Sequence, residues 1–368
     1  MSNARKLADN LPSVGQLFGR NMVINGAMNI SQRHGTSSVQ LSATEQYLTD
    51  RFFNDTGSSF NLTADAVQSS DAPSGFNNSL RISCDAVTTP TSAQNGCITT
   101  IIEGQDCQRL AYGTSDAKDV TLSFYARSGA SNSGHTYGVM LGAYLNGTRN
   151  NQVKSFTVTD SWQRFTITFN GTGTVTGTTK INDDTNPGMQ ISFSLAAGSD
   201  DQVNFSTWTA NTGLKGFTGQ DNFFDNTSNK FYLTGVQLEE GSQATPFEHR
   251  PFGDELVRCQ RYYQVIAEGG SNAPIGPACY YNSSQVNVVI ELSTPMRIPP
   301  SIDVVSGSSY YRIYRSGSNE QVDDFEIDQS STTRVDIRNN TDASGTAGHA
   351  GMARIMNSAG KLAFTAEF

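Results

Sequence analysis

The sequence predicts an all-β protein, and its composition and residue patterning carry that prediction. Only 16% of the 368 residues are charged, whereas helix surfaces are normally covered with Lys, Glu and Arg. Ser, Thr, Asn and 34 Gly fill the polar positions, and short β-branched and aromatic runs alternate with Gly/Asn turn clusters. This texture is typical of antiparallel sandwiches or barrels and excludes a mainly helical protein.

The charge balance excludes several classes of partner. A net charge of −9 argues against a surface that neutralises phosphates, so we expect no nucleic-acid partner. No run approaches 18 apolar residues and the first ten residues do not form a signal peptide, so we expect no membrane insertion. The five cysteines form no CxxC motif and suit free thiols in a reducing cytoplasm, although Cys84, Cys97 and Cys107 could pair in part outside a cell.

The first 20 residues are predicted to form an N-terminal attachment arm. Residues 4–18 carry four apolar side chains at helical spacing, but Pro12 and Gly15 interrupt the stripe. We therefore expect an arm that docks on a partner or packs back on its own chain.

Residues 21–250 are predicted to form the larger β domain. Its clearest expected strands are 22–30, 47–53, 80–84, 120–126, 137–145, 162–169, 189–195 and 231–238. In the strand 162–169, period-two alternation places Phe165, Ile167 and Phe169 on the core face.

Residues 251–265 are predicted to form a short linker helix between two β domains. Pro251 suits the first turn of a helix, and Leu256, Cys259 and Tyr263 would share one face.

Residues 266–368 are predicted to form a second, smaller β-sandwich. In 286–292 the side chains of Val286, Val288, Ile290 and Leu292 share one face, which a second sheet must cover. Further strands are expected at 310–314, 325–327, 334–337, 353–356 and 362–368, the last of them inside a sheet.

Two groups of motifs resemble one family of proteins. The segments 21–28 (NMVINGAM), 31–36 (SQRHGT) and 47–53 (YLTDRFF) resemble the opening of many tail-fibre and related virion proteins of tailed bacteriophages. Further along, 235–250 (GVQLEEGSQATPFEHR) and 255–263 (ELVRCQRYY) are similar to a second signature of those proteins. A "PMR" element in LSTPMRIPP, which ends at Pro300, follows in the same order.

This resemblance implies a jelly-roll sandwich like a carbohydrate-binding module, followed by a second β domain, in a virion appendage. Such proteins are often homotrimers, attach to other virion proteins by the N-terminus and contact host surface polysaccharide. The chain departs from the family at Phe52-Phe53, where a Trp is frequent, which weakens a sugar-stacking role there. The physical role of the motif residues themselves is expected to be structural.

No metal site or cofactor is expected. The four histidines are far apart in sequence and fit no zinc-ligand spacing. Acidic residues at 183–184, with Asn186, and at 200–201 could ligate Ca²⁺, but neither group fits an EF-hand, and solvated turns are the preferred interpretation.

No catalytic residues are predicted either. The acidic pairs at 239–240 and 323–324 are adjacent in sequence, so in a strand they point to opposite faces and cannot flank one glycosidic bond. The chain has no GxSxG motif, P-loop or Cys-His signature. We therefore expect a non-enzyme.

Sugar binding needs an aromatic ring face and nearby hydrogen-bonding groups. The preferred candidates are Tyr310, Arg312 and Tyr314, because an Arg flanked by Tyr at period two is an unusual core face. Trp208 and Phe223, in a loop-rich stretch with several amides, are further candidates.

Three functional hypotheses follow. The first is a tail fibre or receptor-binding appendage that contacts host glycans, located on the virion after synthesis in the host cytoplasm. The alternatives are a non-adhesive virion component, such as a head-decoration or collar protein, and a polysaccharide-degrading tail protein.

Overall fold

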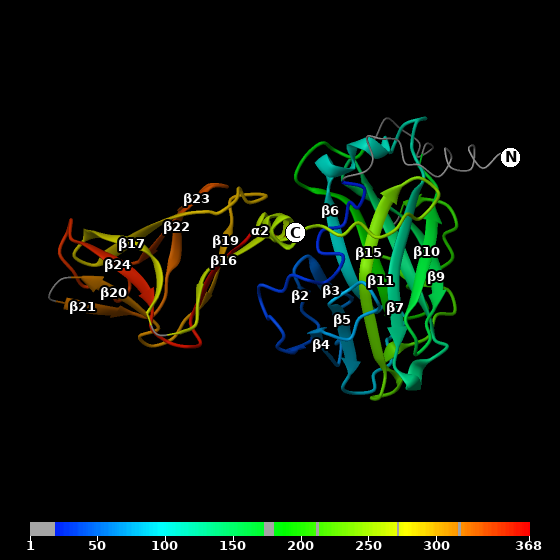
Figure 1. The fold of residues 1–368 in the computed structure, drawn as a ribbon, viewed down its shortest axis with the longest axis horizontal. Helices are drawn as coiled ribbons and strands as arrows, with labels where there is room; N and C mark the ends of the chain where they lie inside the picture. The colour runs from blue at the N-terminus through cyan, green and yellow to red at the C-terminus, as the bar shows by residue number, and fades with distance from the viewer. Residues whose placement is uncertain (1–18, 173–179, 211–212, 271, 316–317) are drawn as a thin grey trace. The chain divides into compact units, whose positions relative to one another are not determined.

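The computed structural model describes residues 19–172, 180–210, 213–270, 272–315 and 318–368, and the predicted arm 1–20 lies almost entirely outside them. The chain divides into two compact units, Met1–Phe252 and Gly253–Phe368. The fold is mostly β, with antiparallel sheets forming β-sandwiches, as predicted (Figure 1).

The first unit packs a six-stranded sheet against a seven-stranded sheet. The six-stranded sheet has the order β1-β4-β5-β15-β7-β10, and β15, β7 and β10 lie side by side in Figure 1. Its strands are β1 (Val39–Gln40), β4 (Ala64–Ser69), β5 (Ser79–Cys84), β7 (Val120–Ser128), β10 (Gln163–Phe169) and β15 (Lys230–Glu240).

The seven-stranded sheet has the order β13-β9-β8-β11-β6-β3-β2. Its strands are β2 (Gln46–Thr49), β3 (Phe52–Gly57), β6 (Asn95–Glu103), β8 (Thr136–Leu145), β9 (Thr148–Thr157), β11 (Pro187–Ala197) and β13 (Thr209–Ala210). The remaining elements of the unit are the parallel pair β12 (Gln202–Val203) and β14 (Gly216–Phe217) and the 3-10 turns η2 (Gly104–Leu110), η3 (Ala130–Asn132) and η4 (Phe223–Asp225).

Aromatic rings join the two sheets of this unit. Phe124 of β7 stacks on Phe165 of β10 at 5.2 Å and meets Phe193 of β11 edge-on at 4.9 Å. The predicted core face of β10 is confirmed, since Phe169 is buried and Phe165 and Ile167 pack against the core.

The outer face of the seven-stranded sheet is polar but buried. Lys215, on the segment that carries β12 to β14, forms an ion pair with Asp55 of β3, and both side chains are more than nine-tenths buried. Gln190 and Thr99 also donate hydrogen bonds to the Asp55 carboxylate, at 3.1 and 3.3 Å. The segment between β12 and β14 therefore covers this sheet face, and its Lys215 neutralises the buried Asp55 carboxylate.

The motif segments at the two ends of the first unit bind each other. The Asn21 side chain donates to the Val236 carbonyl (3.1 Å) and accepts from the Leu238 amide (3.2 Å). Glu248 accepts the backbone N–H groups of Gly19 and Asn21, at 2.6 and 2.7 Å. We call these contacts between 19–26 and 235–250 the clasp.

Two glycines are essential to the geometry of the clasp. A Cβ on Gly26 would lie 2.1 Å from the Val236 carbonyl oxygen, so no other residue fits there. Gly235 has φ +62°, and a Cβ there would lie 2.8 Å from the Phe76 and Tyr125 rings. The two motif segments, distant in sequence, therefore lie in close contact in the fold.

The predicted strand 22–30 is wrong. Asn25 and Met28 have positive φ values of 59° and 55°, and the segment forms turns because the Asn25 side chain holds the Ile30 and Asp50 carbonyls at 2.8 Å each. The predicted strand 47–53 is likewise broken into β2 and β3 by Arg51, whose φ is 70°.

The second unit packs a three-stranded sheet against a seven-stranded one. The three-stranded sheet has the order β16-β25-β19, with β16 (Tyr263–Glu268), β19 (Ser301–Val305) and β25 (Lys361–Thr365). The final predicted strand is therefore confirmed as lying inside a sheet. The larger sheet, in the order β21-β20-β24-β17-β18-β23-β22, contains β17 (Ala273–Asn282), β18 (Gln285–Glu291), β20 (Tyr311–Arg315), β21 (Ser318–Val322), β22 (Glu326–Ser330), β23 (Arg334–Asn339) and β24 (Ala350–Ile355).

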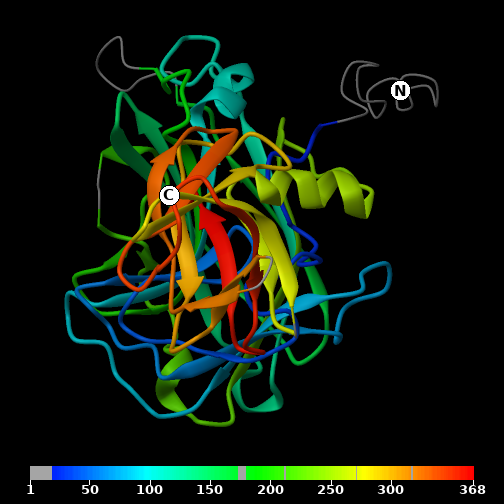
Figure 2. The ribbon, with the colours of Figure 1, turned by 90° about the vertical axis from the view of Figure 1, so that its left-hand side faces the viewer.

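The helix α2 (Phe252–Gln260) is the short yellow-green coil in Figure 2. Cys259 is its buried residue, as its predicted face requires, but the helix ends before Tyr263. Tyr263 belongs to β16, where its hydroxyl donates to Asp303 at 2.6 Å.

Candidate binding surface

The outer face of the larger sheet in the second unit carries the preferred sequence candidates. Tyr311 and Ile313 of β20 point into the core and are fully buried, so Arg312 and Tyr314 point outward. Tyr314 is 50% exposed. The alternation that the sequence predicts is therefore present from Tyr311 to Tyr314.

Two arginines lie directly opposite each other on this face. Arg312 of β20 pairs in register with Arg354 of β24, and the Arg354 guanidinium lies 4.7 Å from the centre of the Tyr314 ring. Within the described residues neither arginine forms an ion pair, and the Nε atom of each is buried without a hydrogen-bond partner. We call Arg312 and Arg354 the arginine pair.

Exposed apolar side chains continue across the sheet from Tyr314. Tyr314 pairs with Met352 of β24, which pairs in turn with Pro277 of β17, and Val289 of β18 lies beyond. Met352 is 43% and Val289 56% exposed. These four residues form what we call the outer row.

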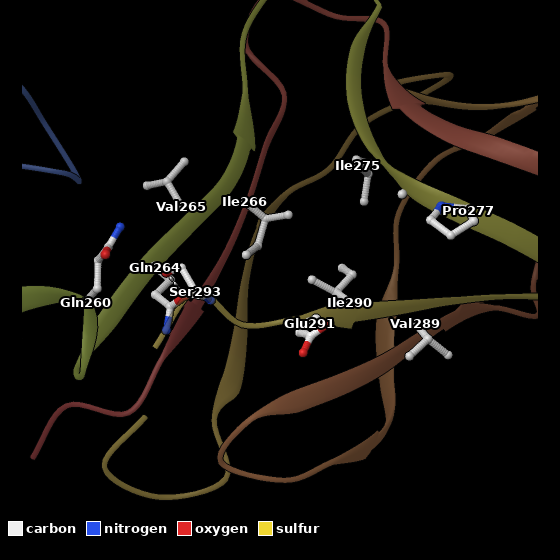
Figure 3. Close-up of a pocket in the computed structure, with 11 residues that line it drawn as sticks. Gln260, Gln264, Val265, Ile266, Ile275, Pro277, Val289, Ile290, Glu291 and Ser293 are labelled. Atoms are coloured by element: carbon white, nitrogen blue, oxygen red, sulfur yellow. Dashed lines mark hydrogen bonds between the residues drawn. The ribbon is translucent and has the colours of Figure 1, made fainter. Parts of the chain in front are cut away.

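A pocket of about 530 Å³ opens beside the outer row. Figure 3 shows Ile266, Ile275 and Ile290 pointing into the space between β16, β17 and β18. It is lined by Gln260, Gln264, Val265, Ile266, Ile275, Gly276, Pro277, Val289, Ile290, Glu291 and Ser293.

Proline explains why the sheet opens at this point. The pairing of β17 with β18 ends at Ala278 and Val288, and the next residue of β17, Pro277, has no N–H to continue the ladder. A bulge between Pro274 and Gly276 shifts the strand further. The pocket is thus a consequence of the local sequence Ala-Pro-Ile-Gly-Pro.

The rim of the pocket is held by a polar contact. The Gln264 side-chain oxygen accepts the hydroxyl and backbone N–H of Ser293, at 2.7 and 3.0 Å. The Gln264 side-chain nitrogen donates to the Thr294 carbonyl at 2.8 Å. These bonds tie the strand β16 to the chain that leaves β18.

The opposite end of the sheet face is acidic. Asp336 of β23 lies opposite Val289, and the Asn287 amide donates to Asp336 at 3.1 Å and to Asp328 at 3.4 Å. Burial and the neighbouring Asp328 raise the pKa of Asp336, although the Asn287 hydrogen bond acts in the opposite direction. Arg338 donates to Asp328 at 2.6 Å, so the acids at this end are partly neutralised.

The other sequence candidates lie elsewhere. Tyr310 precedes β20 and packs against the core of the second unit rather than on the outer face. In the first unit, Trp208 contacts the Tyr112 ring edge-on at 5.5 Å, and its indole N–H donates to the Asn170 carbonyl. Phe223 is fully buried in the core, so neither face of its ring is accessible to a sugar, and it is not part of a binding surface.

Sequence reasoning missed Arg354, Met352, Pro277, Val289 and Tyr281, the last of which is 75% exposed. Alternation within each strand separates outward from inward positions. Alternation does not predict that β24 and β17 follow β20 in the sheet, and this strand order is what brings the residues of the surface together.

A second aromatic cluster lies on the outer face of the six-stranded sheet in the first unit. The Arg127 guanidinium lies 3.8 Å from the centre of the Tyr232 ring, and both Arg127 and the Trp162 indole donate to Asp71. The polar groups of this cluster are therefore paired within the chain, unlike those of the arginine pair.

Within the described part of the chain, no group of three or more His, Cys, Asp or Glu side chains is placed to hold a metal ion. The acidic loop at 183–186 instead binds itself, since Asp184 accepts from the Asn186 backbone and side chain. No described helix is long and apolar enough to cross a membrane.

Comparisons with known proteins find distant structural similarity alone. No protein-family model matches the chain, and no match is found among curated proteins. Solved structures similar to it include the enzymatically active domain of tailspike protein 4 of bacteriophage CBA120 (12% identity, 60% of this chain, TM-score 0.31). The chain spans 21% of that tailspike chain.

Two carbohydrate-binding modules are similar to a comparable degree. One is a family 4 module (17% identity, covering 59% of this chain and 97% of the module, TM-score 0.29). The other is the family 11 module from Clostridium thermocellum, in complex with a mixed-linked tetrasaccharide (15% identity, 56% and 98% coverage, TM-score 0.29).

Proposed function

We propose that this chain is a virion appendage protein of the tail-fibre type, which binds sugar chains through the outer row of its second unit. The observation that carries the proposal is the half-exposed Tyr314 ring, fixed by Arg354 and continued by Met352 and Pro277. An aromatic ring face takes the apolar side of a pyranose, and side-chain amides and guanidinium groups take its hydroxyls.

Hydrogen-bonding groups stand on one side of the ring. Asn319 and Gln321 of β21 pair in register with Tyr314 and Arg312, and both are exposed. Sugar units on Tyr314 would therefore reach two amides on one side and the apolar outer row on the other. The sequence motifs, which resemble those of bacteriophage tail fibres, support the appendage part of the proposal.

The test is sugar binding by the purified full chain. An array of bacterial surface polysaccharides is screened, and affinities for the ligands it finds are measured by calorimetry. The variant Tyr314→Ala should weaken binding at least tenfold, whereas Phe252→Ala, which removes an exposed aromatic side chain at the start of the helix α2, should leave it unchanged.

A structural spacer would behave differently. If no polysaccharide binds and virus particles that lack the protein adsorb to host cells normally, the adhesive function is contradicted and the non-adhesive virion component stands. We also propose that the protein binds without hydrolysis. Shortening of a bound polysaccharide during incubation with the purified chain would overturn that part.

The attachment arm and the homotrimer belong to the same proposal. Deleting residues 1–18 should abolish incorporation into particles with little change in thermal stability. Light scattering of the full chain should give three times the monomer mass, and a monomer would contradict the trimer.

A further inference from the structure

The two positive charges of the arginine pair repel each other, and no acidic side chain of the described residues neutralises them. Like charges directly opposite on neighbouring strands are destabilising. Arg312 and Arg354 nevertheless face each other on β20 and β24, and no carboxylate of the described residues pairs with either of them.

Several other arginines on the outer faces of these sheets are paired with acids, and Arg164 of β10 donates instead to the Ser123 hydroxyl and the Thr245 carbonyl. Their ion pairs are Arg81 with Asp65, Arg127 with Asp71, Arg334 with Glu291, and Arg338 with Glu326 and Asp328. The chain has 34 acidic and 25 basic residues, so a shortage of carboxylates does not explain the unpaired arginines. The arginine pair is therefore the place on this sheet face where a negative charge from outside fits best.

From this geometry we propose that the arginine pair binds the anionic group of an acidic polysaccharide while Tyr314 stacks on the sugar ring; this inference rests on the proposed function. The Nε atoms are buried, so the terminal guanidinium nitrogens are the groups left for a ligand. Guanidinium groups bind planar carboxylates through two parallel hydrogen bonds, and they also bind phosphate and sulfate oxygens.

The rest of the face would orient the chain of sugars. Met352 and Pro277 lead away from Tyr314 as an apolar path, and Asp336 and Asp328 stand at the far end of the sheet. These acids repel a second anionic group, so the charged sugar is favoured at the arginine pair. The ligand class is thus an acidic polysaccharide, with one of its charged units at the arginine pair.

The experiment compares matched acidic and neutral sugars on the full chain. Probes are hyaluronate, alginate and polygalacturonate, each before and after chemical reduction of its carboxyl groups to alcohols, with poly(glycerol phosphate) as the phosphate arm. At least one acidic polymer should bind tenfold or more tightly than its reduced form, and that difference should shrink as salt is raised. Binding of poly(glycerol phosphate) in place of the carboxylated polymers would support the anion site and identify phosphate as the group.

Variants test the residues. Arg312→Gln and Arg354→Gln should each lower affinity for the acidic polymer about tenfold without lowering the unfolding midpoint, because each removes one of two facing like charges. Arg334→Gln, an exposed arginine of the same sheet, is the matched control and should have no effect. Asp336→Asn should leave binding unchanged or strengthen it.

The outcomes separate this inference from the proposed function. Equal binding of acidic and reduced polymers, or full affinity in both arginine variants, overturns the anion site while sugar binding stands. If no polysaccharide of either kind binds, the proposed function fails and the anion site fails with it.

Discussion

Glu248 and Asn21 are 227 residues apart in sequence, yet the carboxylate of Glu248 accepts the backbone N–H of Asn21 at 2.7 Å. The same carboxylate accepts the Gly19 N–H at 2.6 Å, and Arg250 donates to the Val23 carbonyl at 3.0 Å. The motif residues Asn21, Glu248 and Arg250 thus hold the two ends of the first unit together. The candidate site lies in the second unit.

Replacing Glu248 by Gln should destabilise the first unit by about 1–2 kcal/mol at pH 7, because an amide accepts fewer and weaker bonds than a carboxylate. Urea unfolding of Glu248→Gln is compared with Asp116→Asn, which removes an exposed carboxylate from the same unit and should change little. Equal stability of the two variants would show that the clasp contributes nothing.

The difference in stability between wild type and Glu248→Gln should depend on pH. Burial alone would raise the pKa of Glu248, but the backbone N–H groups of Asn21 and Gly19, with Arg250 and Arg20, hold it below its ordinary value. Its contribution is therefore present above the unfolded pKa of about 4.3 and is lost as the pH falls through the lower folded pKa. The stability gap between wild type and Glu248→Gln should close below about pH 4, and a gap that stays constant to pH 2 would contradict this.

Replacing Lys215 by Met should cost about 3 kcal/mol or more, because it leaves Asp55 buried without its cation. The double variant Asp55→Asn with Lys215→Met should recover part of that loss. Thermal unfolding of the three proteins measures both effects. A double variant less stable than the single one would mean that the Asp55 carboxylate is neutralised by other groups.

Adding a methyl group at Gly235 should be costly for two reasons. Its φ of +62° strains an alanine, and the new Cβ would lie 2.8 Å from two aromatic rings. Gly235→Ala should lose about 2–4 kcal/mol. Gly219→Ala, at φ +80° with open space around it, should lose about 1 kcal/mol, so the difference between the two in urea unfolding measures the steric part.

Thiol reactivity gives an independent check of both units. Four cysteines are buried and Cys279 is exposed, and none of these five described residues forms a disulfide. Burial raises the pKa of Cys84 to about 11 and of Cys97 to about 12, which keeps both as unreactive thiols. An aromatic disulfide reagent at pH 8 should modify one thiol rapidly and five after unfolding, and Cys279→Ser should abolish the rapid phase.

Regular strands could be predicted from sequence because alternation is a local signal. The buried set Val286, Val288, Ile290 and Leu292 and the inward-facing Tyr311 and Ile313 lie as the period of two requires. The strand predicted at 22–30 failed for a physical reason: the side chain of Asn25 takes over backbone partners that a strand would have used.

The candidate site was only half predictable. The spacing of Arg312 and Tyr314 within one strand identified them as candidates. Arg354 and Met352 lie beside them only because β24 pairs with β20, and no short window of sequence encodes that strand order. Phe223 failed because an aromatic residue in a polar stretch can still be a core residue, as the 3-10 turn η4 makes it here.

The clasp also bears on how the first unit folds during synthesis. Its partners, at 19–26 and at 235–250, emerge from the ribosome at opposite ends of the unit, so nearly all of its chain must be made before they can meet. Contacts of such long sequence separation form late, because a large loop must close before they stabilise anything. The nascent unit therefore keeps the ends of its sandwich unfastened for most of its synthesis, and the edges of β5 and β7 that pair with β15 stay open until β15 itself has emerged.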